Sequence, residues 1–236
     1  MIHGSAPGRA GGARPGAISK LRAQLVVIAK EPVPGRVKTR LSPAYSPRQA
    51  ARLAEASLAD TLAAAALVPG VRRVLALDGA PGRWLPGGFE VTSQCGGGLD
   101  QRIAAALAAA YSRLPVPVVL IGMDTPQVTP VLLEAALLPL LAGTADAAFG
   151  PADDGGFWLL GLRRPDPRLV LGVPMSQPHT GAVQLARLAE AGLRVHRVPA
   201  LIDVDTAADA AAVAALAPHS RFAAALRSIP AAAAVG

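Results

Sequence analysis

The chain of 236 residues carries a formal net charge of +7, and hydrophobic residues make up 52% of it. No apolar run approaches the roughly 18 to 20 residues that a membrane span needs, so we expect none. The cations are scattered and aromatic residues make up only 3%, which argues against a nucleic-acid-binding surface. The single cysteine, Cys95, excludes an internal disulfide and a cysteine-built zinc site, and it fits a reducing cytoplasm.

The two ends of the chain differ in composition from its middle. Residues 1–22 are rich in glycine, alanine, arginine and proline and lack the apolar stretch of roughly 7 to 15 residues that a secretory signal requires. We expect a disordered tail there, a single domain over residues 23–218, and a C-terminal helix or tail over residues 219–236.

Short apolar runs alternate along the middle of the chain with longer stretches of helical composition. Ser46 is the predicted N-cap of the first helix, and Pro47 its first residue. Strands are expected over residues 24–29, 71–77, 89–93, 116–121, 145–149, 157–162 and 193–198, and helices over residues 47–66, 99–113, 130–141, 180–191 and 206–217. Because helical crossovers join parallel strands, this alternation predicts an α/β fold, a three-layer α/β/α sandwich with a mixed, mostly parallel sheet.

A basic loop follows the first predicted strand. Residues 29–41 read Ala-Lys-Glu-Pro-Val-Pro-Gly-Arg-Val-Lys-Thr-Arg-Leu, with four cations around one glycine and two prolines. The prolines fix φ and Gly35 can take backbone angles closed to other residues, so the loop can aim amide groups at an anion. We therefore expect Lys30, Gly35, Lys38 and Arg40 to bind phosphate at the sheet edge where open α/β folds hold ligands. A solvated charged turn is the alternative.

Three consecutive glycines precede the second predicted helix. Gly97 is the middle one, and Arg102 lies within the first turns of the helix that follows. A helix N-terminus with a nearby cation can hold a phosphate, so Gly97 is a candidate phosphate-binding residue and Arg102 a candidate catalytic residue. The same run of glycines could equally be a flexible connection.

Asp124 follows the most strongly predicted strand, in the sequence Leu-Ile-Gly-Met-Asp-Thr-Pro. A carboxylate at the end of a buried strand needs a partner, and Mg²⁺ or Mn²⁺ takes hard oxygen ligands of this kind together with substrate phosphates. The sequence therefore predicts Asp124 as a metal ligand. The alternative is that Asp124 caps the turn that follows it.

The segment over residues 150–161 reads Gly-Pro-Ala-Asp-Asp-Gly-Gly-Phe-Trp-Leu-Leu-Gly. Glycines let the main chain approach a ligand, Asp154 can accept hydrogen bonds from hydroxyl groups, and Phe157 or Trp158 can pack on a ring. This combination predicts a loop that closes around a polar ligand. A β-hairpin turn with core aromatics is the alternative, because paired glycines between apolar runs are typical of hairpins.

A second acidic segment, Asp203-Val-Asp205-Thr-Ala-Ala-Asp209, precedes the last predicted helix. Alternation along an extended segment places Asp203 and Asp205 on the same side, so one of them could join Asp124 on a metal while the other caps the helix. Asp209 fits a capping box in the first turn better than a metal site.

In this order, four motifs resemble one bacterial family. They are the opening Ala-Lys-x-Pro-x-Pro-Gly-x-Val-Lys-Thr-Arg-Leu, the Gly-x-Asp-x-Pro around Asp124, the Gly-Pro-Ala-x-Asp-Gly-Gly block and the Asp-Val-Asp-Thr at Asp205. They span roughly residues 24–217 and together are specific. The chain is similar to the DUF2064 family, also described as arsenosugar-biosynthesis-glycosyltransferase-like, which is related to 2-phospholactate and molybdenum-cofactor guanylyltransferases.

The resemblance implies a GT-A-type nucleotide-diphospho-sugar transferase fold. By that likeness Lys38 and Arg40 contact the nucleotide phosphates, Asp124 binds the metal ion, Mg²⁺ or Mn²⁺, and Asp205 is the second metal carboxylate. Two segments depart from the family pattern: Gly-Asp-Leu-Gly-x-Arg is replaced by Gly-Gly-Leu-Asp-Gln-Arg at 97–102, and a Trp-Ser-Thr-like element is reduced to Met-Ser-Gln at 175–177. Both departures affect the acceptor side and allow a change of substrate or a loss of activity.

The expected function is that of a cytoplasmic, metal-dependent transferase with a nucleotide-activated donor and an unidentified small-molecule acceptor. The group around Asp154 would hold the sugar or acceptor and could supply a general base. A glycosyltransferase acting on a nucleotide sugar is preferred. A nucleotidyltransferase that releases pyrophosphate from a nucleoside triphosphate, and a non-catalytic nucleotide-binding module, remain alternatives.

Overall fold

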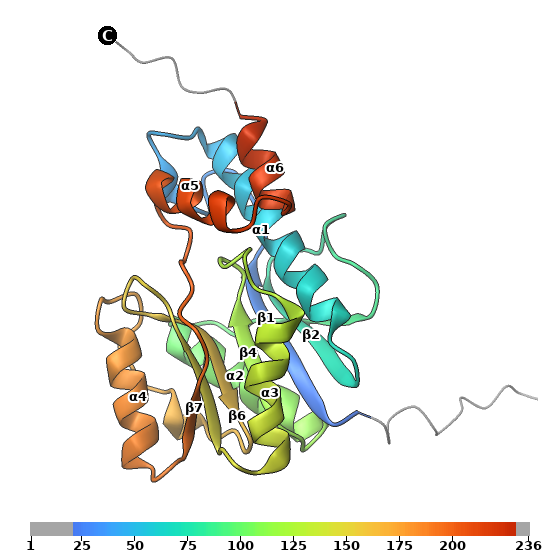
Figure 1. The fold of residues 1–236 in the computed structure, drawn as a ribbon, viewed down its shortest axis with the longest axis vertical. Helices are drawn as coiled ribbons and strands as arrows, with labels where there is room; N and C mark the ends of the chain where they lie inside the picture. The colour runs from blue at the N-terminus through green and yellow to red at the C-terminus, as the bar shows by residue number, and fades with distance from the viewer. Residues whose placement is uncertain (1–20, 230–236) are drawn as a thin grey trace, which may run out of the picture.

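The computed structural model describes residues 21–229, which form a seven-stranded mixed sheet with helices on both faces (Figure 1). The strands lie in the order β3-β2-β1-β4-β6-β5-β7. Their bounds are Ala23–Lys30 for β1, Val71–Asp78 for β2, Phe89–Ser93 for β3, Val118–Gly122 for β4, Ala147–Pro151 for β5, Phe157–Leu162 for β6 and Val195–Arg197 for β7. Only β6 runs antiparallel to its neighbours, β4 and β5, so the predicted mixed, mostly parallel sheet is confirmed.

Helices cover both faces of the sheet because its central strands are apolar on both sides. In β1, Leu25 and Val27 belong to the core on the side of α1 and α3, while Val26 and Ile28 belong to the core on the side of α2 and α4. These helices span Pro47–Leu67 for α1, Leu99–Arg113 for α2, Pro130–Ala142 for α3 and Thr180–Glu190 for α4. The three-layer α/β/α sandwich expected from the sequence is therefore the observed architecture.

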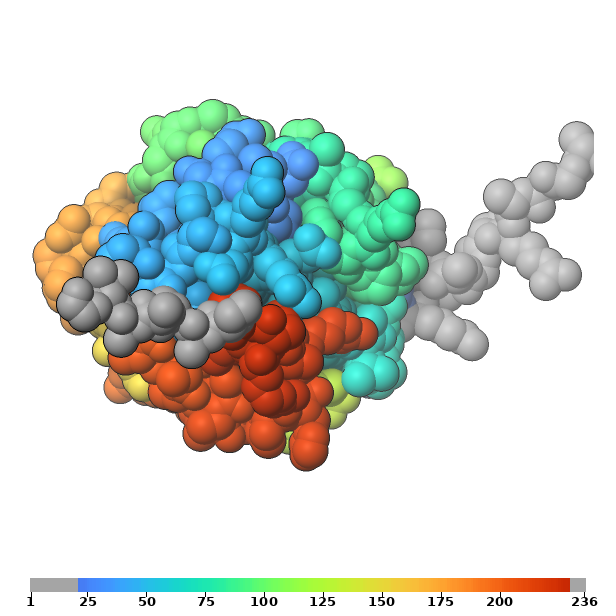
Figure 2. Space-filling view, turned by 90° about the horizontal axis from the view of Figure 1, so that it is seen from above, coloured from blue at the N-terminus to red at the C-terminus, as the bar shows by residue number. Residues whose placement is uncertain are grey.

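A third apolar cluster closes one end of the molecule, where the last two helices meet the start of α1. The helix α5 spans Ala207–Leu216 and α6 spans Arg221–Arg227. Figure 2 shows both, in red, beside the light blue segment that leads into α1. Phe222 of α6 is 1% exposed and packs in this cluster with Leu53 of α1.

The helix caps follow the sequence signals. Ser46 caps α1 in a capping box with Gln49. Thr206, rather than Asp203 or Asp205, caps α5 in a capping box with Asp209, whose carboxylate accepts a hydrogen bond from the Thr206 amide at 2.7 Å. Asp209 therefore has the structural role that the sequence favours for it.

Element bounds differ from the expected ones mainly beside prolines and at short edge strands. The strand expected over residues 116–121 begins at Val118, after Pro117, because proline has no amide to donate to a sheet. The boundary expected at residue 218 falls between α5 and α6. Of the two expected tails, residues 1–20 and 230–236 lie outside the described part of the chain. Within residues 21–229, no helix is both long enough and apolar enough to cross a bilayer.

Candidate functional site

A cleft of about 960 Å³ opens at the carboxyl ends of the parallel strands. It lies beside Lys30 at the end of β1 and Asp124 just after β4. Of the residues predicted for the site, the following line it: Lys30, Lys38, Arg40, Gly97, Arg102, Asp124, Asp154 and Asp205. Gly35 does not line the cleft. One cavity therefore collects the cationic loop and carboxylates from three separate segments, at Asp124, Asp154 and Asp205.

The basic loop leaves β1 through a tight turn. The Arg36 amide donates to the Val33 carbonyl at 3.0 Å, and Gly35 has a φ of +79° that suits glycine. Gly35 therefore shapes the loop from outside the cleft rather than contacting a ligand there. Lys38 has a φ of +49°, a left-handed conformation that costs roughly 1 to 2 kcal/mol for a residue with a Cβ. Such strain tends to persist at functional sites.

The Lys38 ammonium group is buried among acidic side chains. Its side chain is 7% exposed, and Nζ lies 2.8 Å from Asp124 Oδ1 and 3.4 Å from Asp205 Oδ1. Nζ also donates a hydrogen bond to the Val204 carbonyl. Burial lowers the pKa of Lys38, but the facing carboxylates of Asp124, Asp203 and Asp205 outweigh that effect and raise it. Lys38 is therefore a charged ammonium that joins the two predicted metal carboxylates.

Arg40 also pairs with a predicted metal ligand. Its guanidinium Nη1 lies 2.6 Å from Asp205 Oδ2, while the Arg40 side chain is 68% exposed. Both cations that the sequence assigns to phosphate, Lys38 and Arg40, thus contact carboxylates in the structure. The sequence gives no signal for these pairings, because the partners lie far apart along the chain.

Hydrogen bonds to backbone carbonyls hold the acidic segment 203–205 beside the end of β4. The Val204 amide donates to the Asp124 carbonyl at 3.1 Å. In the same two segments, the Gln127 side-chain amide donates to the Ile202 carbonyl at 2.7 Å. These bonds fix Asp203 and Asp205 on either side of the buried Val204, next to Asp124.

The loop between β5 and β6 presents Asp154 and is packed against the start of α4. Asp154 Oδ1 accepts a hydrogen bond from the Gly156 amide at 2.9 Å, and the Gly181 amide donates to the Gly155 carbonyl at 2.8 Å. A Cβ on Gly155 would lie 1.9 Å from the Pro178 carbonyl oxygen. The segment is a β-hairpin loop, as the second expectation has it, and it lines the cleft, while its closing around a polar ligand stays a prediction.

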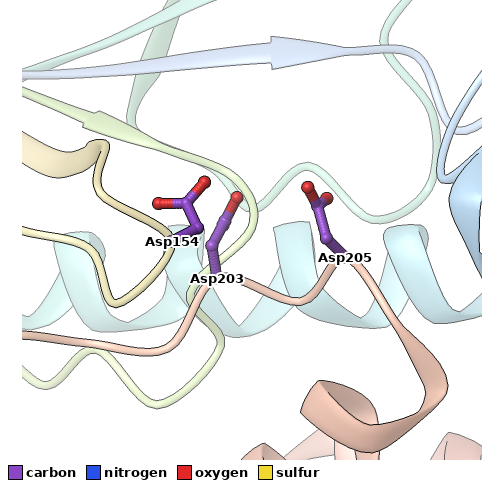
Figure 3. A group of neighbouring side chains, drawn as sticks. All are labelled: Asp154, Asp203 and Asp205. Atoms are coloured by element: carbon purple, nitrogen blue, oxygen red, sulfur yellow. The ribbon is translucent and has the colours of Figure 1, made fainter. Parts of the chain in front are cut away.

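Three carboxylates gather where these segments meet (Figure 3). One oxygen from each of Asp154, Asp203 and Asp205 lies within 4.8 Å of the others, and their side chains point in the same direction. Burial raises the pKa of Asp203 to about 8, and the negative charges of Asp124, Asp205 and Asp154 add to that effect while Lys38 opposes it. Asp203 is therefore a member of the acidic cluster alongside the predicted Asp205.

Two cations of the cleft wall are left without a carboxylate partner among residues 21–229. Lys30 and Arg36 line the cleft, both are exposed, and neither has an ion pair within the described part of the chain. Arg102, by contrast, is held in place: its Nη1 lies 2.9 Å from Asp78 Oδ2, and its Nε donates to the Gly97 carbonyl at 3.0 Å. Sequence reasoning counted Arg36 among the four cations of the loop but assigned it no role.

The two candidate aromatic residues, Phe157 and Trp158, differ in burial. Trp158 is 3% exposed and its indole donates to the Pro199 carbonyl at 3.0 Å, so most of its ring is core. Phe157 is partly buried, lines the cleft and contacts Phe149 with ring centroids 5.6 Å apart. Both residues line the cleft, and Phe157 is the less buried of the two. The hydroxyl of Thr125, which also lines the cleft, is buried without a hydrogen-bond partner among the described residues.

Comparison with known proteins identifies the family. Residues 53–177 match the family described as "Uncharacterized protein conserved in bacteria (DUF2064)". The chain belongs to the DUF2064 family. The match includes Asp124 and Asp154, whereas the basic loop and the segment 203–205 lie outside the matched residues. No curated protein matches this DUF2064 chain.

Solved structures share the fold of this DUF2064 protein. A protein from Desulfovibrio desulfuricans G20, provisionally named a nucleotide-diphospho-sugar transferase, has 27% sequence identity and a TM-score of 0.80, over 88% of this chain and 94% of its own. The 2-C-methyl-D-erythritol 4-phosphate cytidylyltransferase of Thermus thermophilus has 18% identity and a TM-score of 0.51, over 84% of this chain and 100% of its own. The 4-diphosphocytidyl-2C-methyl-D-erythritol synthase of Anaerococcus prevotii has 10% identity and a TM-score of 0.52, over 84% and 99%. The GT-A-like fold expected from the motifs is therefore confirmed.

Proposed function

We propose that this protein is a metal-dependent glycosyltransferase that takes its sugar from a nucleotide-diphospho-sugar. The observation that carries the proposal is one cleft that holds cations from the loop after β1 and carboxylates from three separate segments. Nucleotide-using transferases need these two sets of charges together, one for the donor phosphates and one for a divalent ion. The structural relative with a TM-score of 0.80, named as a nucleotide-diphospho-sugar transferase, supports this assignment.

The donor diphosphate would lie against Lys30 and Arg36. Since these two side chains have no described carboxylate partner, a phosphate can pair with them without breaking an existing ion pair. Arg102 adds a cation whose direction is fixed by Asp78. The expected ligands Lys38 and Arg40 could join only after leaving Asp124 and Asp205.

The acidic cluster fits a divalent cation. Asp203 and Asp205 of this cluster, together with Asp124, offer the hard oxygen ligands that Mg²⁺ and Mn²⁺ prefer, and the Lys38 ammonium already contacts Asp124 and Asp205. When bound, such an ion would stabilise the charge that develops on the leaving diphosphate. The unpartnered hydroxyl of Thr125 beside Asp124 would gain a hydrogen bond from a polar ligand in the same place.

Asp154 would hold the acceptor. The Gly156 amide and the packing of Gly155 on α4 fix the carboxylate at the mouth of the β5–β6 hairpin. In glycosyl transfer the acceptor oxygen forms a bond to the anomeric carbon, the bond from that carbon to the phosphate oxygen breaks, and the nucleoside diphosphate leaves. The acceptor proton would pass to Asp154 as general base. Phe157 could cover the apolar face of the sugar.

Nucleotidyl transfer is the second candidate function. Three cations of the cleft, Lys30, Arg36 and Arg102, could neutralise a triphosphate, which carries more charge than the diphosphate of a sugar donor. In that reaction an acceptor oxygen would attack the α-phosphate and pyrophosphate would leave. Both reactions use the same nucleotide position, so the product decides between them.

A two-step experiment tests the proposal. Thermal unfolding is measured with each common nucleoside triphosphate and nucleotide sugar, with and without Mn²⁺, and the stabilising donors are then assayed for released nucleoside diphosphate and pyrophosphate. Metal-dependent stabilisation by a nucleotide sugar and release of nucleoside diphosphate support glycosyl transfer, whereas pyrophosphate release assigns nucleotidyl transfer. If a donor binds but neither product forms, in the wild type and in Asp124→Ala alike, the protein is a non-catalytic nucleotide-binding module.

A further inference from the structure

The position between two metal-binding carboxylates of the proposed site is already taken by a side chain of the protein. Lys38 Nζ lies 2.8 Å from Asp124 Oδ1 and 3.4 Å from Asp205 Oδ1, and the side chain is only 7% exposed. An Mg²⁺ ion liganded by the same carboxylates needs oxygen atoms at about 2.0 to 2.1 Å. The ammonium and the ion would therefore compete for one pair of ligands and would repel each other across a few ångströms.

The ammonium is held there by more than charge. Nζ also donates to the Val204 carbonyl, in the segment that a backbone hydrogen bond fixes to Asp124. The left-handed backbone of Lys38, with φ at +49°, is part of the same arrangement. By contrast, Lys30 reaches the same cleft and has no described ion pair. Lys38 is therefore already paired with carboxylates, whereas Lys30 is available to pair with a ligand.

We propose that Lys38 is the resident counterion of the donor-free site, and that it leaves Asp124 and Asp205 when a divalent ion enters together with the donor phosphates. This inference rests on the proposed metal-dependent use of a nucleotide donor. The long flexible stem of Lys38 lets the displaced ammonium turn toward the incoming phosphates. Their negative charge then replaces that of the two carboxylates. Metal and nucleotide then bind as a unit, and the metal alone binds weakly.

Displacement of the Lys38 ammonium is favourable only when the metal ion and the nucleotide are both present. Metal alone would have to expel a buried ammonium with no anion to receive it, which costs free energy. The phosphates supply that anion, so nucleotide should strengthen metal binding, and by linkage metal should strengthen nucleotide binding equally. Arg40, bound to Asp205 at 2.6 Å but 68% exposed, can be released into water and imposes no such condition.

Removing the lysine charge tests this directly. Mn²⁺ binding is measured by electron paramagnetic resonance, first with Mn²⁺ alone and then with ADP, CDP, GDP and UDP in turn, on the wild type, Lys38→Met and Lys38→Gln. Both variants should bind Mn²⁺ alone at least about tenfold more tightly than the wild type, since one unit of competing charge is lost. The strengthening by the stabilising nucleotide should shrink by a similar factor. Lys38→Gln keeps an uncharged side-chain donor, so it covers the case in which Lys38→Met fails to fold.

The matched control is Lys30→Met, which removes the same charge from the same cleft. It should leave the affinity for Mn²⁺ alone within about twofold of the wild type and weaken nucleotide binding instead. Wild-type protein that binds Mn²⁺ equally well with and without nucleotide, or Lys38 variants that bind it no more tightly, overturns the counterion role while leaving the metal site in place. Absence of Mn²⁺ binding by every protein, with any nucleotide, refutes the metal-dependent function itself.

Discussion

At the scale of single residues, Asp124 and the acidic cluster together hold four carboxylates, and among the described residues only Lys38 and Arg40 form ion pairs with them. One oxygen atom from each of Asp154, Asp203 and Asp205 lies within 4.8 Å of the others, and Lys38 Nζ links Asp124 to Asp205. Like charges held together in a partly buried place destabilise the folded chain until a cation binds. Such a cluster is the expected signature of a site that gains its stability from a ligand.

Replacing one member of the cluster should therefore raise stability and remove metal binding together. We expect Asp203→Asn to increase the metal-free unfolding midpoint by about 2 to 4 °C, corresponding to about 1 kcal/mol for a chain of this size. The same variant should lose most of the stabilisation that Mn²⁺ gives with nucleotide. Differential scanning fluorimetry measures both effects. Asp153→Asn, a neighbouring exposed carboxylate outside the cluster, is the control and should change neither quantity.

Lys30 offers a test of the donor side. Because a charge-assisted hydrogen bond contributes roughly 1.5 to 3 kcal/mol, Lys30→Met should raise KM for the donor by about 10-fold to 100-fold. The value of kcat should change less if Lys30 contacts phosphate equally in the ground and transition states. Arg48→Met removes an exposed cation on α1 outside the cleft and should leave KM unchanged. A fall in kcat alone for Lys30→Met would contradict this role.

At the scale of elements, the hairpin loop between β5 and β6 depends on glycines that admit no side chain. A Cβ on Gly181, at the start of α4, would lie 2.5 Å from the Gly156 carbonyl oxygen. Gly181→Ala should therefore move the loop that carries Asp154 and cost about 1 to 3 kcal/mol of stability. Turnover should fall while nucleotide binding, measured by calorimetry, is kept. A Cβ on Gly87 meets no atom within 4 Å, so Gly87→Ala is the matched control and should be silent.

An ion pair links the starts of β5 and β7 and gives the fold a pH dependence. Arg194 Nε and Nη2 donate to Asp146 at 2.8 and 3.0 Å, and these side-chain bonds, with one from the Arg194 amide, lower the pKa of Asp146 to about 2 from 3.8. Since the folded state favours the charged carboxylate, the stabilisation is complete above the ordinary pKa and is lost as the pH falls from about 4 through about 2.

The variant Asp146→Asn should therefore lose less stability over that pH range than the wild type. Urea unfolding at a series of pH values between neutral and acid measures the slope. Glu55→Gln, at an exposed position of α1 with no described ion pair, should keep the wild-type slope. Equal slopes for Asp146→Asn and the wild type would show that the pair does not stabilise the fold.

At the scale of the whole molecule, α6 completes the core that α1 and α5 begin. Phe222 is 1% exposed, and the amide of Phe222 donates to Asp60 of α1 at 2.9 Å. Phe222→Ala should cost about 3 to 5 kcal/mol, a typical loss for a large buried aromatic side chain. Leu216→Ala at a position that is 65% exposed should cost little. The difference is measurable by chemical denaturation, and equal small losses would mean that α6 is dispensable.

Much of this architecture could be predicted from the sequence, because periodicity and caps are local signals. The bounds of α2 agree with the expected residues, Ser46 caps α1, and Asp209 completes the capping box of α5. Strand-end positions also predicted that Lys38 and Asp124 share a cleft. Pairings between distant segments could not be predicted in the same way, since ion pairs such as Lys38 with Asp124 depend on where the folded backbone brings each side chain.

The reversed strand β6 has a consequence for how such a site can diversify. Because β6 alone runs against the sheet, the end of β5 and the start of β6 meet at the cleft within one short hairpin. In the function proposed above, the hairpin serves the acceptor, while the donor depends on segments elsewhere in the chain. Grafting only the hairpin from a relative would then exchange acceptor preference and preserve donor preference. The range of acceptors can therefore evolve independently of the donor.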